Sequence, residues 1–162
     1  MVLNTLFVLL LSSCSEEINL TSPNSNLFFE DSIKKISKSI EEWQKELTAE
    51  QFYITREKGT EKAFTGVYWD NYQRGIYSCV CCDLPLFKSE TKFKSGTGWP
   101  SFYAPINDFN VGEKKDDSFG WNRVEVICNR CDAHLGHVFE DGPKPTGLRY
   151  CLNSAALNFS KL

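Results

Sequence analysis

The stretch that decides the fold is CNRCDAHLGHVFEDGPKPTGLRYCLN, which runs from Cys128 to Asn153. It holds a Cys-x-x-Cys pair, both histidines of the 162-residue chain and one separate cysteine, Cys151. A second Cys-x-x-Cys pair lies upstream, at Cys79 and Cys82. Paired cysteines at this spacing are typical of zinc sites. The pattern therefore predicts one metal site and one separate candidate nucleophile.

The predicted zinc ligands are the four paired cysteines: Cys79, Cys82, Cys128 and Cys131. A gap of two residues suits a turn that points both sulfurs of a pair at one ion. Two disulfides are the alternative, since an exported protein could form them. We favour one structural Zn²⁺ per chain, because a Cys-x-x-Cys disulfide is usually catalytic rather than structural. Cys81 is left over, and we interpret it as a buried thiol rather than a redox partner.

Residues 142–147 (GPKPTG) predict a turn-rich loop between two strands, 134–139 and 148–153. An antiparallel hairpin around this loop places His137 opposite Cys151. Side chains in such a cross-strand pair come within about 5 Å of each other. We therefore expect an imidazole beside the thiol.

The other histidine, His134, has the opposite parity to His137 along the same strand. A bulge at Gly136 would bring both rings to one face. The two histidines could instead be zinc ligands, but four cysteines already complete a ligand set. We therefore expect both histidines to transfer protons beside Cys151.

By default, a cysteine in a short apolar run such as that around Cys151 is a small buried hydrophobe. Its neighbours favour a reactive thiol instead. Arg149 lies on the same strand face, where its charge could stabilise a thiolate, and Asn153 offers an amide for hydrogen bonding. Cys151, His134, His137, Arg149 and Asn153 are therefore the candidate catalytic residues.

The composition fits one globular domain with extensions, since 41% of the residues are hydrophobic. The 14% of aromatic residues suits a β-rich domain packed around large rings. The net charge is −3, from 18 basic and 21 acidic residues mixed along the chain. No basic face is visible, so we expect no binding to nucleic acid.

Apolar residues at three- and four-residue spacing predict a helix over residues 31–50, capped at Asp31 or Ser32. A capping box at Thr48 and Gln51 predicts a second short helix. Beyond Gly59, short β-rich runs predict five strands, at 64–69, 75–80, 124–128, 135–139 and 148–153, and a loop over 107–120. The expected fold class is α+β, predominantly antiparallel β, with small N-terminal helices packed on two antiparallel sheets and a four-cysteine zinc site.

The N-terminal residues 3–11 are largely apolar, too few to span a bilayer but similar to the core of a secretory signal. The sequence that follows, Leu-Ser-Ser-Cys ending at Cys14, resembles a bacterial lipobox. We therefore expect a lipoprotein signal peptide at 1–14, a polar tether at 15–30 and the folded domain at 31–162. This predicts a lipid anchor at Cys14 and a membrane-anchored protein of the cell envelope that faces the periplasm or the exterior. The alternatives are a buried N-terminal strand or an incorrectly assigned start, and a cytoplasmic location.

Four motifs resemble those of the B-type methionine sulfoxide reductases, in their zinc-containing form. They are Gly59-Thr60-Glu61, the run from Ser95 to Phe102, the run from His134 to Phe139 and the run from Arg149 to Ser154. The resemblance extends from about Glu42 to Leu157, with the two Cys pairs at the zinc positions of the family.

This resemblance implies an oxidoreductase, a peptide-methionine (R)-S-oxide reductase. It would reduce the R epimer of methionine sulfoxide in peptides and proteins, since each epimer needs its own enzyme. By this resemblance Cys151 attacks the sulfoxide sulfur and becomes a sulfenic acid, while His134 and His137 supply protons. Asn153 would orient this network and Arg149 would favour the thiolate.

The resemblance also implies a binding site for the substrate methyl group at Trp99, with Phe102 beside it. Many members of the family have a resolving cysteine where this chain has Thr97. The sulfenic acid would then be resolved by Cys81 or by an external thiol, and we favour a thioredoxin-like reductant. We expect a monomer. The competing functions are a zinc-ribbon-type binding module without turnover and a redox sensor that uses Cys151 as its signal.

Overall fold

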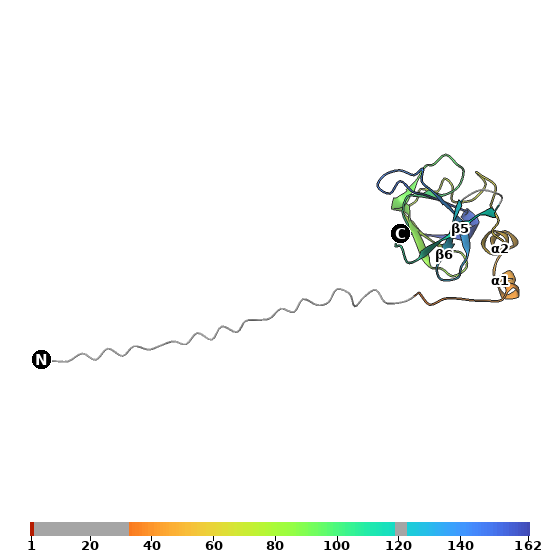
Figure 1. Cartoon of the computed structure of the whole chain (residues 1–162), viewed down its shortest axis with the longest axis horizontal. Coiled ribbons are helices and arrows are strands. Elements are labelled where there is room, and N and C mark those ends of the chain that lie inside the picture. Colours follow the sequence, from red (N-terminus) through yellow and green to blue (C-terminus); the bar gives the residue numbers. More distant parts are fainter. Residues whose placement is uncertain (2–32, 119–122) are drawn as a thin grey trace. The chain divides into compact units, whose positions relative to one another are not determined.

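Two antiparallel sheets carry most of the regular structure in the computed structural model, which describes Met1 and residues 33–118 and 123–162. The smaller sheet has the strand order β2-β1-β9, with β1 at Gly75–Cys79, β2 at Pro85–Lys88 and β9 at Leu157–Lys161. Figure 1 shows the two short helices at one side of these β elements. The predicted α+β class with two antiparallel sheets is confirmed. The predicted segments 1–14 and 15–30, with Cys14, lie outside the described residues.

The larger sheet has the order β3-β4-β8-β7-β6-β5 and contains the whole of the hairpin that the sequence predicts. Its strands, in chain order, are β3 Lys92–Phe93, β4 Ser101–Phe102, β5 Val111–Asp116, β6 Arg123–Cys128, β7 His134–Phe139 and β8 Arg149–Leu152. Short 3-10 turns at Ser89–Thr91 and Ser154–Ala156 precede β3 and β9. Four of the five predicted strands are confirmed, with ends shifted by a residue or two.

The fifth predicted strand, 64–69, is wrong. Phe64 has a φ of 66°, in the left-handed region that an extended strand does not use. The backbone N–H of Thr65 donates to the carbonyl of Lys62, which forms a turn. The predicted loop at 107–120 is also wrong in part, because β5 lies within it and pairs along its whole length with β6. That strand is polar on its exposed face, so its sequence reads like a loop.

The predicted long helix over 31–50 is wrong in its first part. Helix α1 covers Ile40–Glu46 and starts at a capping box formed by Ser39 and Glu42, not at residue 31 or 32. The described segment before it is not helical, and Ile36 donates its N–H to the carbonyl of Arg130. Helix α2 covers Ala49–Arg56 and starts at the predicted capping box of Thr48 and Gln51.

Large aromatic side chains fill the core next to the site. Tyr77, Phe87 and Phe102 are fully buried, and the ring of Phe102 lies 5.0 Å from that of Tyr77 and 4.7 Å from that of Phe87. Leu135 and Leu152 close the core beneath the hairpin of β7 and β8. Since strand side chains alternate between faces, burying Leu152 turns its neighbour Cys151 to the other face of the sheet.

Candidate active site and metal centre

Cys151 lies in β8 between two strands. In the hairpin it is paired with His137 of β7, as the sequence predicts, and on its other side it is paired with Ser101 of β4. The turn-rich residues 142–147 connect the two strands of the hairpin. The thiol is therefore held in the middle of the larger sheet rather than on a loop.

A β-bulge brings the second histidine beside the first. The pairing of β6 with β7 shifts register so that Leu135 is the extra residue, one position before the predicted bulge at Gly136. The rings of His134 and His137 lie 5.4 Å apart as a result. Gly136 is required here because a side chain on it would collide with the carbonyl of Cys151.

His134 is buried and bound to a carboxylate. Its Nδ1 lies 2.8 Å from Oε1 of Glu125, whose other oxygen accepts a 2.8 Å hydrogen bond from Nζ of Lys58. Burial lowers the pKa of His134, so the ring is neutral near pH 7 and donates Nδ1–H to Glu125. Its Nε2 is buried and has no partner among the described residues, which leaves it as an acceptor.

His137 has its own carboxylate. Its Nε2 lies 2.8 Å from Oδ2 of Asp116, which also accepts a 2.9 Å bond from Arg123. Hydrogen bonds from Ser118 and then His137 hold the pKa of Asp116 well below its usual range. An ionised Asp116 fixes the ring by accepting a hydrogen bond from Nε2–H, so Nδ1 is the remaining nitrogen of His137.

Arg149 is fixed beside the thiol by a two-pronged bond to Asp141, with Nε–Oδ1 2.8 Å and Nη2–Oδ2 2.9 Å. Its guanidinium also stacks over Phe139, 4.4 Å from the ring centre. Burial raises the pKa of the Cys151 thiol above its ordinary value, and Arg149 only partly opposes this. The role of Arg149 in favouring the thiolate stays a prediction.

A cavity of about 170 Å³ opens onto Cys151. Trp99 lines it together with the thiol and His137, so the structure brings these three predicted residues together. The other lining residues are Thr60, Arg123, Gly136, Phe139, Leu152 and Asn153. Its walls combine aromatic rings, an imidazole and a thiol.

The backbone of Glu61 holds two sides of this cavity. Trp99 donates its ring N–H to the carbonyl of Glu61 over 3.1 Å, and Oδ1 of Asn153 accepts the Glu61 N–H over 3.0 Å. The other end of the Asn153 amide donates to the carbonyl of Leu135. Among the described residues, the Asn153 amide is therefore bonded to backbone at both ends, and its orienting role stays a prediction.

Three predicted site residues are not among those that line the cavity: Phe102, His134 and Arg149. Phe102 is fully buried in the aromatic core and is not among the residues that line the cavity. His134 also does not line it, but lies behind His137. The sequence missed the carboxylates of Asp116 and Glu125, although Glu125 is the cross-strand neighbour of His137 and could have been found from the register of the sheet.

The four predicted metal ligands converge. The sulfurs of Cys79, Cys82, Cys128 and Cys131 all lie within 4.8 Å of one another. Two contacts join the pairs, with Cys79–Cys131 at 3.6 Å and Cys82–Cys128 at 3.5 Å. Zn–S bonds of about 2.3 Å in a tetrahedron put sulfurs about 3.8 Å apart. The donor set fits such an ion, and all four are free thiols rather than disulfides.

An arginine and a fifth thiol surround these ligands. Arg56 donates to the carbonyl of Cys131 over 2.8 Å and to its sulfur over 3.5 Å. Its guanidinium lies 4.0 Å from the ring of the buried Trp43. Cys81 is half-buried and lies in the chain between the ligands Cys79 and Cys82, so it belongs to the metal centre by position.

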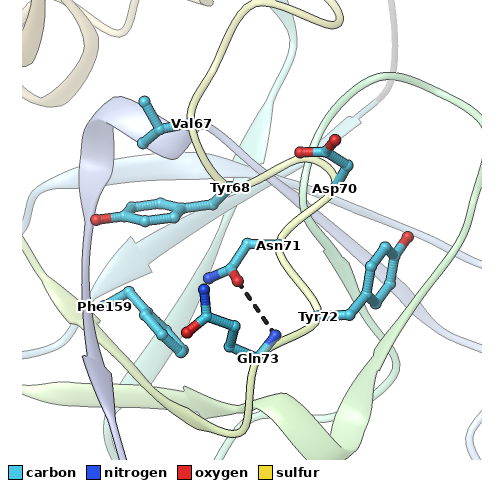
Figure 2. A pocket seen from close by; sticks show the side chains of 7 residues that line it. All are labelled: Val67, Tyr68, Asp70, Asn71, Tyr72, Gln73 and Phe159. Carbon is cyan, nitrogen blue, oxygen red and sulfur yellow. Dashed lines mark hydrogen bonds between the residues drawn. The ribbon is translucent and has the colours of Figure 1, made fainter.

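A larger hollow of about 610 Å³ is lined by Val67, Tyr68, Asp70, Asn71, Tyr72, Gln73 and Phe159. Figure 2 shows these side chains around the hollow, with Asn71 accepting the backbone N–H of Gln73 over 3.1 Å. The lining contains neither a thiol nor an imidazole. Size alone therefore does not make it the reactive site, and the smaller cavity at Cys151 is the candidate.

The profile of the SelR domain family matches residues 47–161 of this chain. Peptide methionine sulfoxide reductase B1, chloroplastic, of Oryza sativa subsp. japonica is 65% identical over 122 residues, 75% of this chain and 56% of that protein. The enzyme of the same name from Arabidopsis thaliana is 63% identical over 78% of this chain and 62% of its own length. Peptide methionine sulfoxide reductase MsrB of Leptospira interrogans is 56% identical over 78% of this chain and 97% of its own length. The chain thus spans little more than half of the two plant relatives but almost all of the bacterial one.

These relatives contradict the predicted location in the cell envelope. The two plant proteins are chloroplastic by name, and none of the three is named as a lipoprotein. Among the residues described, no helix has the length and apolar character needed to cross a membrane. An apolar run of about nine residues before Cys14 was too weak a signal to decide where the protein resides. The envelope prediction is therefore wrong.

Proposed function

The chain belongs to the SelR domain family, that of the B-type methionine sulfoxide reductases, and on that premise we propose that it reduces the R epimer of methionine sulfoxide in peptides and proteins. The observation that carries this proposal is the pairing of Cys151 with His137 at the wall of a cavity that also contains Trp99. A thiol, a proton carrier and an aromatic ring are the groups that this reaction requires.

In the proposed first step, the sulfur of Cys151 attacks the sulfoxide sulfur and the S–O bond breaks. The thiol and the sulfoxide together give a cysteine sulfenic acid and methionine, so the cysteine is oxidised by two electrons and the substrate is reduced by two. Because burial raises the pKa of this thiol, a proton acceptor beside it would assist the attack. Arg149 would stabilise the negative sulfur as it forms.

The two histidines would carry the protons. His137 lines the cavity, and its Nδ1 is the nitrogen left over by the bond to Asp116, so it would take the proton of the Cys151 thiol and give it to the sulfoxide oxygen as the S–O bond breaks. His134 lies behind it with an Nε2 that has no partner among the described residues, which suits a second proton carrier. Glu125 would keep His134 in the required tautomer.

Trp99 and Phe139 would bind the methyl end of the substrate, since both rings line the cavity. Asn153 would line the cavity with a fixed polar side chain rather than bind the histidines, because its amide is bonded to the backbone at both ends. Phe102 is not part of this proposal.

Reduction of the Cys151 sulfenic acid back to the thiol would require a thiol from outside the cavity. Two external thiols convert the sulfenic acid back to the thiol and release water, and themselves form a disulfide. Thr97 offers no sulfur for this step, and Cys81 lies in the chain between the metal ligands Cys79 and Cys82. We therefore retain a thioredoxin-like dithiol as the reductant and a single chain as the catalytic unit, with the domain at 31–162.

The metal centre would be structural. Zinc would be held by the two cysteine pairs and would stabilise the fold by joining the ends of β1 and β6. Cys128 and Cys131 flank the turn that leads directly into His134. The centre would therefore hold one end of the active-site hairpin without entering the reaction.

The test of this proposal is to trap the intermediate. The protein is mixed with excess methionine-R-sulfoxide without a reductant, and a dimedone adduct is located by mass spectrometry. One equivalent of adduct on Cys151, formed only with substrate, is expected, and Cys81→Ser should behave like wild type. An adduct on Cys81 instead, or none in a folded zinc-loaded protein, would reject Cys151 as the nucleophile and favour the binding module.

A further inference from the structure

Glu61 is a buried acidic residue that forms no salt bridge among the described residues. Its Oε1 accepts the backbone N–H of Ser154 over 2.7 Å, and its Oε2 accepts that of Ala155 over 2.9 Å. Burying a carboxylate is costly unless hydrogen bonds replace the lost water. Gly66 lies against the carboxylate, where a side chain would collide with it. The side chain of Glu61 is therefore fixed to the segment that begins at Ser154.

The two N–H groups that Glu61 binds belong to the turn that follows the strand of Cys151. Ser154–Ala156 is a 3-10 turn, and its cap residue Asn153 makes no side-chain hydrogen bond to it. The first N–H groups of a helical turn have no partner inside the turn. Glu61, which is distant in the chain, thus supplies the cap that the local sequence lacks.

The backbone of Glu61 contacts the side of the cavity where the substrate would bind. Its carbonyl accepts the ring N–H of Trp99 over 3.1 Å. That N–H is the only polar group of a tryptophan side chain, so this bond sets how the ring is turned. The main chain beside Trp99 is held separately, because the carbonyl of Pro100 accepts the N–H of Leu152 over 3.0 Å. Loss of the contact with Glu61 should therefore turn the ring without moving the strand.

We propose that Glu61 is a positioning residue, whose carboxylate fixes the main chain that orients the ring of Trp99 beside Cys151. The inference rests on the proposed function, in which Trp99 binds the methyl end of the substrate. Glu61 does not line the cavity, so it would act through Trp99. The orientation of the ring matters because a misplacement of about 1 Å in an active site can cost roughly 10²-fold in rate.

Two variants weaken the hold of the carboxylate in different ways. Glu61→Gln places an amide NH₂ group against one of the two backbone N–H donors, so one hydrogen bond is lost. Ser154→Pro removes one of those donors, and the extended backbone of Asn153, with φ −75° and ψ 132°, accommodates a following proline. Ser154→Ala is the matched control for the lost hydroxyl, which accepts the N–H of Tyr68. Glu42→Gln is the control for a carboxylate that accepts a backbone N–H elsewhere.

The first measurement follows the ring N–H of Trp99 in a proton–nitrogen correlation spectrum of the zinc-loaded full chain. The chain has four tryptophans, and the peak of Trp99 is the one that is missing in Trp99→Phe. This peak should move in Glu61→Gln and Ser154→Pro and stay in place in both controls. In wild type, the ring N–H of Trp99 and the amide of Ser154 should exchange slowly with solvent. Fast exchange of either would overturn the inference without any variant.

The second measurement separates KM from kcat. In Glu61→Gln and Ser154→Pro, the KM for the R epimer should rise about tenfold with little change in kcat, because Trp99 would contact substrate and transition state alike. The rate at which iodoacetamide alkylates Cys151 should equal that of wild type. A lower melting temperature with an unmoved Trp99 peak and a wild-type KM would show that Glu61 only stabilises the fold, which would overturn the inference. Failure of wild type to reduce methionine sulfoxide would instead contradict the proposed function, and the Trp99 peak would still show whether Glu61 orients the ring.

Discussion

Glu125 and His134 form a buried pair on neighbouring strands, with 2.8 Å between Oε1 and Nδ1, and both side chains are 3% exposed. The carboxylate is neutralised at its other oxygen by Lys58. It therefore orients the ring without making it a permanent cation, since burial lowers the pKa of His134.

Glu125→Gln should reduce turnover while the protein stays folded. The amide cannot hold the Nδ1–H tautomer as strongly as the carboxylate, so Nε2 is less often the acceptor. We expect kcat to fall by about tenfold, less than the ~10²–10⁴-fold that a proton-transfer group supplies, because the ring itself remains. Lys58→Gln is the control, because it removes the charge that binds the other oxygen of Glu125. We expect it to lower kcat less than Glu125→Gln does. Equal activity of Glu125→Gln and wild type would exclude a catalytic role for this pair.

Asp116 should stabilise the fold in a defined pH range. Its pKa is held below its usual range in the native state, so it contributes stability above its unfolded value of about 3.9. That contribution is lost as the pH falls through the lower native pKa. Thermal unfolding of wild type and Asp116→Asn should therefore differ at pH 6 and converge in strong acid. A difference that stays constant with pH would show that the titration of Asp116 is not its source.

Arg56 should protect the metal centre. It bonds to both the carbonyl and the sulfur of Cys131 while it stacks on Trp43. Groups that support metal ligands typically contribute about 10–100-fold to metal affinity. We expect Arg56→Gln to release zinc to a chromogenic chelator about tenfold faster than wild type. The matched control is Lys45→Gln, on the exposed face of α1. Equal rates of zinc release from Arg56→Gln and Lys45→Gln would contradict this role of Arg56.

Phe102 should act on stability rather than on substrate binding. It is enclosed by Tyr77 and Phe87 and does not reach the cavity. Replacing it by leucine should cost about 1–3 kcal/mol of unfolding free energy, because the loss of the ring leaves unfilled space in the core. The KM for methionine sulfoxide should be unchanged. A rise in KM without loss of stability would return Phe102 to the substrate site.

The sequence predicts those parts of the site that depend on local chemistry. The turn residues at 142–147 set the register of the hairpin, so the pairing of His137 with Cys151 follows from counting residues. The cysteine spacing likewise predicts which four sulfurs converge. The capping box at Thr48 predicts the start of α2.

Features that depend on distant contacts could not be predicted in this way. Strand β5, Val111–Asp116, is largely charged and is a strand only because it pairs with β6, so the sequence alone predicts a loop at Asp116. Helix α1 begins later than its apolar pattern suggests, because the segment before it binds the carbonyl of Arg130. The burial of Phe102 likewise depends on residues of the other sheet.

Turnover of the separated R and S epimers of a dabsylated methionine sulfoxide, with dithiothreitol as reductant, tests the central claim most directly. The zinc-loaded wild type should consume the R epimer over many cycles and leave the S epimer, and Cys151→Ser should consume neither. Consumption of the S epimer, activity that survives in Cys151→Ser, or a reaction that stops after one equivalent would contradict the claim.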